Sequence, residues 1–479
     1  MAHTPEGTTA RSAVDPGLQR GLSTRHIVFI ALGTAIGTGL FYGSAPAIQT
    51  AGPAVVLAYM AAGLAVFMVM RALGEMAVRE PVSGSFGAYA HRYLGPFAGF
   101  VTGWTYVFEL SIVVIADVTA VALYMRFWYP DSPAWVWIGA CILFIGAVNL
   151  THVGNFGELE FWLSIIKVVA ILGMIIGGIV LMVMGMSYDG ETTAGLHNLV
   201  EHGGFMPEGF TGVLLALAIV VFSFGGIETI GITAGEAKDA AGALPKAINT
   251  VPARILIFYV GTMIVIMSLV PWNAIDGKTS PFVQIFDALG VPFAPHILNF
   301  VVLTAAVSAV NACTYSIGRL LYAMAGDGHA PRAFRTVSSN GVPWAAVGLV
   351  LGVMVVGALI NTLWNDVFVT VAQVATFAVV FTWMMILMTH RGMRKAMARH
   401  GEEPGSFALP GGAFTTWTTM AFIALVIGLL AWDPDSRQAL LVGLVWLAVL
   451  TAVWFLGARR HGHRNVRTGT MPLAVEEYR

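Results

Sequence analysis

The sequence is poor in charged residues. Asp, Glu, Lys and Arg make up only 11% of the 479 residues, while 57% are hydrophobic; a soluble domain carries about 25% charged residues. A globular chain of this size would need a polar surface, and a lipid solvent removes that need. The net charge is −1 at pH 7. The chain therefore has no overall basic field for nucleic acid, and we expect no nucleic-acid partner.

Cysteine and clustered metal ligands are also scarce. The two cysteines, Cys141 and Cys313, lie inside apolar segments, which argues against a disulfide framework and favours packing as small hydrophobic residues. The twelve histidines fall mostly in tails and connections, and no His/Cys cluster has zinc spacing. We therefore expect no metal and no cofactor.

Long apolar runs dominate the rest of the chain. A membrane-spanning helix needs about 20 mostly apolar residues. Twelve segments meet this requirement, so the sequence predicts an all-α integral membrane protein with twelve transmembrane helices. The segments cover residues 26–48, 53–78, 97–125, 133–150, 159–185, 210–235, 252–271, 294–325, 343–363, 367–390, 413–432 and 438–458.

The placement of positive charge tests this count. With both termini on one side, that side holds 21 of the 25 Lys and Arg residues, while the other holds only Arg126, Lys278 and Arg437. The remaining one, Lys167, lies inside the fifth segment. The positive-inside rule assigns the basic side to the cytoplasm. We therefore expect a multi-pass protein of the cytoplasmic (inner) membrane with both termini inside the cell.

The same reading gives the domain organisation. Residues 1–24 are polar and contain no apolar signal-peptide core, which predicts a disordered cytoplasmic tail. A single domain is expected over residues 25–460, followed by a cytoplasmic tail at 461–479. Within the domain, two five-helix units are expected at about 26–185 and 210–390, and helices 11 and 12 at about 413–458 are appended.

Glycine interrupts the first predicted helix. Gly33, Gly37 and Gly39 lie in the run Gly33–Phe41. The Gly33/Gly37 spacing is typical of a helix-packing face, whereas a Gly-x-Gly inside a span also lets a helix unwind. A nucleotide-binding interpretation fails because no strand precedes the glycines.

The sixth predicted helix decides between these two alternatives. It is interrupted in the same way, at Gly225-Gly226, and the acid Glu228 follows inside the span. Helices 1 and 6 each open a five-helix unit, and an odd number of spans inverts the second unit. Paired interruptions of this kind indicate an inverted-repeat transporter whose site lies at the membrane midplane. Unwound backbone offers free N–H groups to a carboxylate and free C=O groups to an ammonium, and a zwitterionic amino acid carries both.

The ordered motifs of the chain resemble those of a known family. They extend over about residues 18–460, and the sequence resembles an amino-acid permease of the amino acid–polyamine–organocation superfamily, in its bacterial amino acid transporter branch. Within that branch it looks most similar to proline-specific and histidine permeases. One departure is Ala240, where the branch usually has Pro. The motifs are Arg20–Leu22, Gly33–Phe41, Arg71–Met76, Gly84–Phe86, Gly103-Trp104, Gly157–Trp162, Phe224–Glu228, Ala234–Ala237, Ser308–Asn311 and Arg319–Ala325.

The resemblance implies roles for individual residues. Thr38 and Gly39 match positions that bind the substrate carboxylate. Ala35, Phe222 and Gly225 match positions whose carbonyls receive the amino group, and Phe222 also matches the aromatic that caps the occupied site. Gly37 and Gly226 belong to the same two interruptions. The implied fold is the inverted-repeat bundle of five plus five helices with two more appended.

Ionisable residues inside the spans are functional candidates by default. Glu109 and Asp117 are eight residues apart and share a helix face, although either could serve only to join helices. Asp117 falls where the branch usually has Glu. Glu228 is a coupling or gating candidate together with Phe222. Glu75 is expected to pair with Arg71 one turn away, because an i,i+4 ion pair is the simpler account, and it is left out of the site.

Lys167 is the remaining candidate for coupling. By resemblance it matches a lysine associated with proton coupling, because relatives that use sodium bind the ion between helices 1 and 8, close to helix 5. The alternative is that Lys167 snorkels to the cytoplasmic surface. We expect a proton as coupling ion and no sodium.

These features together predict a secondary transporter that imports an amino acid and binds it at the breaks of helices 1 and 6. Phe222 and Phe224 are expected as apolar walls and Asp117 as one polar contact, which suits proline, histidine or another neutral amino acid. An amino-acid exchanger is the alternative. A channel lacks support because no filter-like segment repeats, and an intramembrane enzyme lacks a histidine in the middle of a span. The expected partners are the amino-acid substrate and the lipid bilayer.

Overall fold

The structure is a computed structural model of the whole chain. It describes Phe29 and residues 36–82, 84–150, 153–187, 192–234, 240–276, 280–339, 341–363, 367–434 and 436–458. Several predictions lie outside these residues, namely those for Ala35, Gly33 and the two tails at 1–24 and 461–479.

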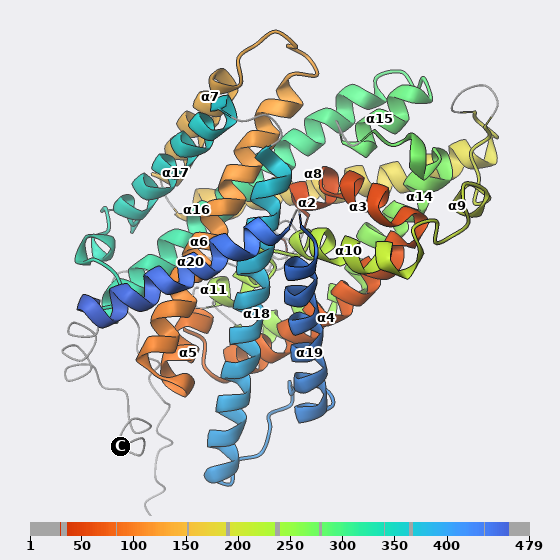
Figure 1. Cartoon of the computed structure of the whole chain (residues 1–479). Coiled ribbons are helices and arrows are strands. Elements are labelled where there is room, and N and C mark those ends of the chain that lie inside the picture. Colours follow the sequence, from red (N-terminus) through yellow and green to blue (C-terminus); the bar gives the residue numbers. More distant parts are fainter. Residues whose placement is uncertain are drawn as a thin grey trace, which may run out of the picture.

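The regular structure of the described residues is helical, apart from one isolated bridge between Ser187 and Thr193. Figure 1 shows long helices that cross the molecule at varied angles. The helices are α2 Thr38–Phe41, α3 Ser44–Ala51, α4 Val55–Arg79, α5 Ser85–Leu94, α6 Pro96–Met125, α7 Ala134–Asn149, α8 Val153–Val183, α9 Asn198–Glu201, α10 Gly209–Phe222, α11 Thr229–Ala234, α12 Ala240–Asn249, α13 Val251–Arg254, α14 Thr262–Leu269, α15 Pro281–Ala288, α16 Ala294–Gly326, α17 Trp344–Leu363, α18 Val367–Arg399, α19 Gly412–Trp432 and α20 Arg437–Val453.

The apolar runs of the sequence form these helices because lipid cannot hydrogen-bond a free backbone. Within the described residues, nine helical stretches are long and apolar enough to cross a membrane, and two shorter apolar helices are α7 and α10. They coincide with the predicted segments after the first. Of the first segment, the structure describes Phe29 and the residues from Ile36 onwards, which form α2 and α3.

The structure adds helices that the span count did not predict. The connection after α4 contains α5, which is amphipathic and ends at Gly95. Gly95 has φ +106°, a value that suits glycine, and Pro96 then starts α6 at a position where its missing N–H costs nothing. Helix α18 continues to Arg399, beyond the predicted end at residue 390. Apolarity marks the lipid-facing part of a helix and carries no information about its polar extension.

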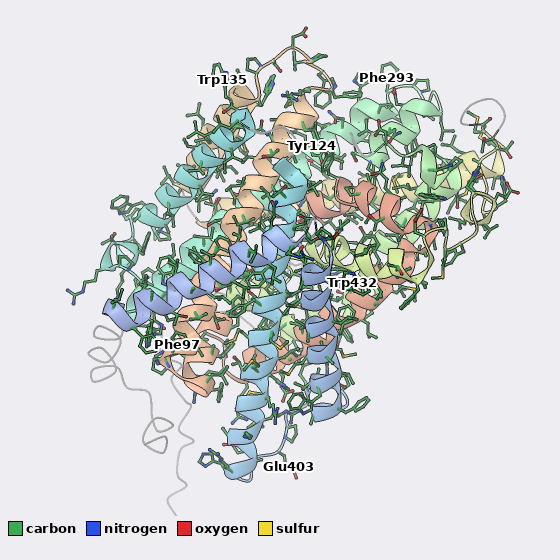
Figure 2. The ribbon with its side chains drawn as sticks, viewed as in Figure 1. Phe97, Tyr124, Trp135, Phe293, Glu403 and Trp432 are labelled. Carbon is green, nitrogen blue, oxygen red and sulfur yellow. The ribbon has the colours of Figure 1, made fainter. Side chains whose placement is uncertain are left out.

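Contacts between connections agree with the predicted alternation of sides. Trp128, after α6, donates from its indole N–H to Nδ1 of His296 at the start of α16, over 3.0 Å. At the other end, the rings of His91 in α5 and His329 after α16 lie 5.0 Å apart. Burial, and then the neighbouring His91, lowers the pKa of His329 to about 4. In Figure 2, Trp135 and Phe293 lie at the end of the molecule opposite Glu403.

Helix α6 forms the centre of the bundle. It packs most extensively against α16 and α18 and also contacts α5, α7 and α17. Most of its residues are buried, including Glu109 and Asp117. Helices α19 and α20 are peripheral, because only 33% and 22% of the residues in their apolar spanning stretches are buried inside the protein. The acids of α6 therefore lie inside protein, not against lipid.

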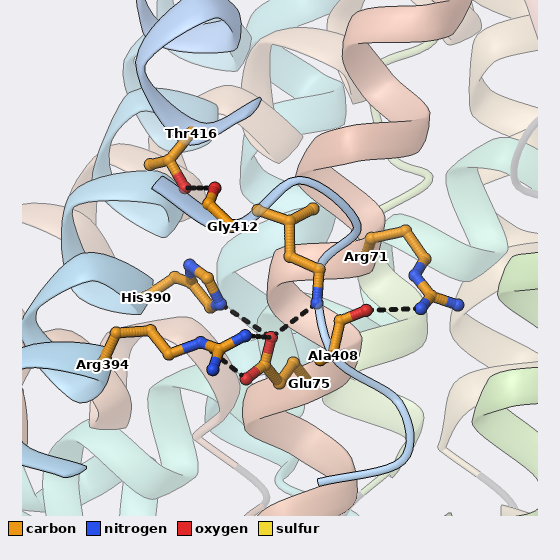
Figure 3. A network of polar contacts seen from close by, with 8 residues as sticks. Arg71, Glu75, His390, Arg394, Ala408, Gly412 and Thr416 are labelled. Atoms are coloured by element: carbon orange, nitrogen blue, oxygen red, sulfur yellow. Dashed lines mark hydrogen bonds and ion pairs between the residues drawn. The ribbon is translucent and has the colours of Figure 1, made fainter. Parts of the chain in front are cut away.

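The expected ion pair between Glu75 and Arg71 is wrong. Figure 3 shows that the Glu75 carboxylate faces α18, where it forms an ion pair with Arg394 (Nε–Oε1, 2.9 Å) and contacts Nε2 of His390 at 2.9 Å. It also accepts the backbone N–H of Leu409 at 2.7 Å. Arg71 points elsewhere and donates to the carbonyl of Ala408 at 2.5 Å. Tertiary partners, which sequence spacing cannot show, replace the local pair and join α4 to α18 and to the loop before α19.

A matched glycine pair tests how the appended helices pack. A Cβ at Gly443 of α20 would overlap the ring of Phe377 in α18, whereas a Cβ at Gly428 of α19 meets open space. We expect Gly443→Ala to lower the unfolding free energy by about 1–3 kcal/mol, because a packed interface tolerates added volume poorly. Thermal unfolding of the purified protein in detergent measures this. An unchanged midpoint for Gly443→Ala, or an equal loss for Gly428→Ala, would contradict the packing described.

Candidate functional site

The sixth segment is broken at its centre. Helix α10 ends at Phe222 and α11 begins at Thr229. Between them the N–H groups of Ser223, Phe224 and Gly225 bond to the carbonyls three residues earlier, which tightens the last turn. Gly226 then has φ +90°, where a residue with a Cβ is strained. The predicted interruption at Gly225-Gly226 is therefore confirmed.

Glu228 stabilises this break. Its Oε1 accepts the free backbone N–H of Gly226 at 3.0 Å, and its Oε2 accepts the indole N–H of Trp383 in α18 at 3.2 Å. Thr229 donates its hydroxyl to the carbonyl of Gly226 at 2.7 Å. The side chains supply partners for backbone groups that a broken helix leaves open. The buried acid therefore has a structural task in addition to the coupling or gating role predicted for it.

The first segment is interrupted just before Thr38. Gly37 is extended, with φ −122° and ψ −164°, and α2 begins at the next residue. The N–H groups of Thr38 and Gly39 belong to the first turn of α2, and no acceptor for them is recorded among the described residues. A Cβ at Gly37 would lie 4.0 Å from Cβ of Ala309 in α16. The break thus lies against the eighth segment.

The two breaks meet at Gly39 and Ser223. The Ser223 hydroxyl donates to the carbonyl of Gly39 at 2.8 Å. A Cβ on Gly39 would lie 2.6 Å from Cα of Ser223, closer than real Cβ contacts come. The hydroxyl of Tyr259 donates to the carbonyl of Ser223 at 3.1 Å, and the hydroxyl of Tyr59 lies 3.5 Å from the hydroxyl of Ser223. Two segments far apart in sequence therefore present their irregular backbone to each other.

Asp117 lies beside the first break. The hydroxyl of Thr38 donates to its Oδ1 at 2.5 Å. Asp117 is buried, and within the described part of the chain no donor reaches its Oδ2. The structure therefore brings together three of the predicted site residues, Thr38, Gly39 and Asp117, and leaves one carboxylate oxygen able to accept a further hydrogen bond.

The two phenylalanines of the sixth segment face different surroundings. Phe222 is buried and makes an edge contact with Phe368 of α18, at 6.0 Å between centroids, and Phe368 makes another with Tyr42 at 4.5 Å. Phe224 instead packs on Tyr259 at 4.6 Å and on Tyr59 of α4 at 6.1 Å, and both tyrosines also approach Ser223. The two phenylalanines therefore have different aromatic neighbours, and their role as apolar walls of the site stays a prediction.

Lys167 is fully buried and does not reach the surface. Its Nζ donates to the hydroxyl of Ser308 in α16 at 2.9 Å, and that hydroxyl donates to Oε1 of Glu160 at 2.5 Å. Lys167 and Asp117 are also close enough to interact electrostatically. Lys167 is the one Lys or Arg that lies well inside a predicted segment, and Glu160, seven residues before it on α8, is joined to it through Ser308. Ser164, also on α8, donates to the carbonyl of Phe29 at 2.9 Å.

Glu109 joins a second buried cluster. Its Oε2 accepts the hydroxyl of Thr382 at 2.8 Å, and the adjacent residue Trp383 holds Glu228. Glu109 and Glu228 are also close enough to interact electrostatically. Although Glu109 and Asp117 share a face of α6, they therefore serve different partners.

Several residues of the site were not singled out from sequence. Ser223, Glu160 and Ser308 each stand within a quoted motif or next to a candidate, and a search for hydroxyls beside buried charges would have found Ser308. Phe368 and Tyr42 carried no signal, because aromatic residues are common in membrane segments. Ala35 lies outside the described residues.

The all-helical architecture, the many apolar spans and the paired breaks define a multi-pass membrane protein of the transporter class. The family profile Amino acid permease matches residues 26–470. The chain belongs to this family of the amino acid–polyamine–organocation superfamily, which consists of transporters and not of enzymes.

Three relatives show how far the similarity extends. The chain is 46% identical over 439 residues to the "Uncharacterized amino acid permease YtnA" of Bacillus subtilis (strain 168), covering 91% of this chain and 95% of that protein. It is 45% identical over 436 residues to the "Aromatic amino acid transport protein AroP" of Escherichia coli (strain K12), covering 90% and 94%. It is 42% identical over 442 residues to the "Probable threonine/serine transporter YbxG" of Bacillus subtilis (strain 168), covering 92% and 95%.

A substitution at Gly39 tests the contact between the breaks. We expect Gly39→Val to reach the membrane but to lose uptake about tenfold or more, because its side chain would push Ser223 away and distort both breaks. Gly352→Val in α17, where a Cβ meets open space, is the matched control. Uptake of labelled amino acids by cells with equal membrane amounts of each variant measures the effect. Near-normal uptake by Gly39→Val would place the site elsewhere.

Proposed function

We propose that this protein imports a small neutral amino acid across the cytoplasmic membrane by proton symport. The observation that carries the proposal is the junction of the two breaks, where Gly39 contacts Ser223. Irregular backbone at membrane depth is tolerated only where it is buried in protein or lines a cavity, and in transporters it is where substrate binds. Both termini are proposed to be cytoplasmic, on the side that carries most Lys and Arg.

The chemistry of the junction suits a zwitterion. The first-turn N–H groups of Thr38 and Gly39 would hold the substrate carboxylate, since helix N-termini favour anions. The carbonyls of Ala35, Phe222 and Gly225 would accept the ammonium. Gly39 and Ser223 are in direct contact here, so a substrate that enters between them must part the breaks. Binding would thus move helices 1 and 6 relative to each other.

The surrounding aromatic residues fit an external lid. Phe222 contacts Phe368, which contacts Tyr42, and Phe368 lies at the start of α18, on the side opposite the basic connections. In the proposed topology these rings separate the junction from the outside. Phe222 is therefore proposed to cap the bound substrate.

The acids near the junction favour a neutral substrate side chain. Asp117 lies beside the first break and leaves its Oδ2 without a donor in the described residues, whereas Glu109, whose Oε1 also lacks a donor there, lies in the separate cluster with Thr382. A cationic side chain would meet one carboxylate that already interacts with Lys167. The names of the relatives, aromatic amino acid for AroP and threonine/serine for YbxG, are both neutral classes. Proline and histidine remain candidates on the same grounds.

A competition panel tests this substrate class. We expect an excess of unlabelled neutral amino acids to inhibit uptake of labelled proline, histidine, phenylalanine or threonine, whichever is transported. Arginine and lysine should inhibit little, because the junction lacks a second free carboxylate. The measurement is uptake into proteoliposomes that contain the purified protein. If arginine or lysine competes better than every neutral amino acid, the substrate class is wrong.

Lys167 is proposed to couple proton binding to transport. Its ammonium reaches Ser308 on the eighth segment, and its helix contacts the first segment through Ser164 and Phe29. These contacts support a position for Lys167 in the region between helices 1 and 8, where by resemblance sodium-dependent relatives hold their cation. The protonated amine would favour one arrangement of these helices and the neutral amine another, so proton binding would shift the equilibrium between them.

Exchange of Lys167 for a neutral residue tests this coupling. We expect Lys167→Met to lose accumulation against a gradient while it still exchanges internal for external substrate, because the substrate junction is intact but no proton is bound. Lys246→Met, which removes an exposed lysine from α12, should accumulate substrate as the wild type does. Proteoliposomes with an inward proton gradient, with and without protonophore and sodium, provide the readout.

Two results would rule the mechanism out. One is a strict dependence of wild-type uptake on sodium. The other is accumulation by Lys167→Met that equals the wild type under the same gradient. If the wild type only exchanges amino acids and ignores the proton gradient, the protein is the exchanger that the family also allows.

A further inference from the structure

A cavity lies far from the substrate junction, between α18 and the start of α19. Its volume is about 420 Å³, within the range of about 300–1,000 Å³ that is typical of small-molecule sites. Its charged and titratable lining consists of His390, Arg391, Arg394 and Glu402, and Thr416 and Trp417 complete the opposite side. The proposed topology places this end of the molecule at the cytoplasmic surface of the membrane.

Among the described residues, the carboxylates around the cavity leave one guanidinium, that of Arg391, without an ion pair. Arg394 is neutralised by Glu75, and Glu402 is neutralised by Arg79. Arg391 forms no ion pair with any carboxylate in the described residues. It lies over the ring of Trp417, with its Cζ 4.2 Å from the ring centroid. The cavity is therefore a site for negative charge.

His390 supplies a second, independent observation. Its side chain is only 1% exposed, its Nε2 contacts Glu75, and its Nδ1 is buried without a hydrogen-bond partner in the described residues. In Figure 3 this second nitrogen lies on the side of the ring away from Glu75, where Gly412 and Thr416 of the cavity wall also lie. A buried imidazole nitrogen normally has a partner. Because Nε2 donates to the Glu75 carboxylate, Nδ1 carries a proton only when His390 is an imidazolium, and in that form it would donate to an acceptor in the cavity.

The surroundings identify the source of that acceptor as lipid. Helix α19 is peripheral, and its Trp417 and Phe414 are 52% and 76% exposed. Trp417 lies five residues into α19, about 7.5 Å along its axis, at the depth where tryptophan marks the membrane–water interface. Basic pockets between helices on the cytoplasmic side suit the head groups of anionic lipids.

We propose that the cavity between α18 and α19 binds the phosphate group of an anionic phospholipid from the cytoplasmic leaflet. Arg391 would bind the phosphate, His390 would donate from Nδ1, and the acyl chains would pass beside Trp417 and Phe414. The proposal uses the orientation given with the proposed function but does not depend on the substrate or on proton coupling. Because Arg394 and His390 also hold Glu75, the lipid would stabilise the joint between α4, α18 and the loop before α19.

The test compares lipid stabilisation of the purified detergent-solubilised protein across variants. Phosphatidylglycerol, phosphatidylcholine and inorganic phosphate are each titrated, and the thermal unfolding midpoint is recorded. Phosphatidylglycerol should raise the midpoint saturably, and the two other probes should not. Arg391→Gln should weaken the apparent affinity by about tenfold or more, the effect of losing one charge-assisted phosphate contact. The apparent affinity of Arg391→Lys should fall between those of the wild type and Arg391→Gln.

Controls make each outcome decisive. Lys395→Gln removes a neighbouring charge of α18 that does not line the cavity, and it should respond as the wild type does. An Arg391→Gln variant with unaltered lipid response overturns the proposal, as does equal stabilisation by phosphatidylcholine. Stabilisation by inorganic phosphate alone shows a free-anion site and overturns the lipid assignment. If Arg391→Gln does not fold, Arg391→Lys carries the test, and a wild-type response from it refutes the role of the guanidinium fork. None of these readouts requires transport, so failure here is distinct from failure of the proposed function.

Discussion

Inside a bilayer, each backbone N–H and C=O must find a partner within the protein, because an unsatisfied group costs several kcal/mol in lipid. A break in a membrane helix is therefore stable only where other groups satisfy the exposed backbone. Glu228 does this for the N–H of Gly226, and Ser223 does it for the carbonyl of Gly39. These bonds explain why the breaks face each other at the centre of the bundle, and why the site is built mainly from backbone.

The same constraint governs the buried charges. Lys167 and Glu160 are joined through the hydroxyl of Ser308, and Glu109 and Glu228 accept hydrogen bonds from the adjacent residues Thr382 and Trp383. Buried charges are tolerated when they are paired and hydrogen-bonded. The second cluster includes Glu228 of the sixth-segment break, and the helix of the first cluster, α8, contacts the first segment through Ser164 and Phe29. Protons that enter or leave these clusters would therefore act on the elements that must move when substrate binds.

The sequence was sufficient to predict the spans and both breaks, because apolar length and paired glycines report directly on backbone in lipid. It was insufficient for partners across helices. Glu75 was matched with Arg71 by spacing, yet it binds Arg394, 319 residues away along the chain. Phe222 and Phe224 were expected together as walls of the site, yet they pack on different aromatic residues, Phe368 and Tyr259. Pairings of this kind depend on tertiary packing, which no local pattern encodes.

The central claim is that substrate binds between the two breaks, and an experimental structure of the protein with a saturating amino acid tests it most directly. The account predicts the substrate carboxylate at the N–H groups of Thr38 and Gly39, its ammonium at the carbonyls of Phe222 and Gly225, and Gly39 parted from Ser223. Substrate bound at any other position, with the contact between Gly39 and Ser223 unchanged, would contradict it.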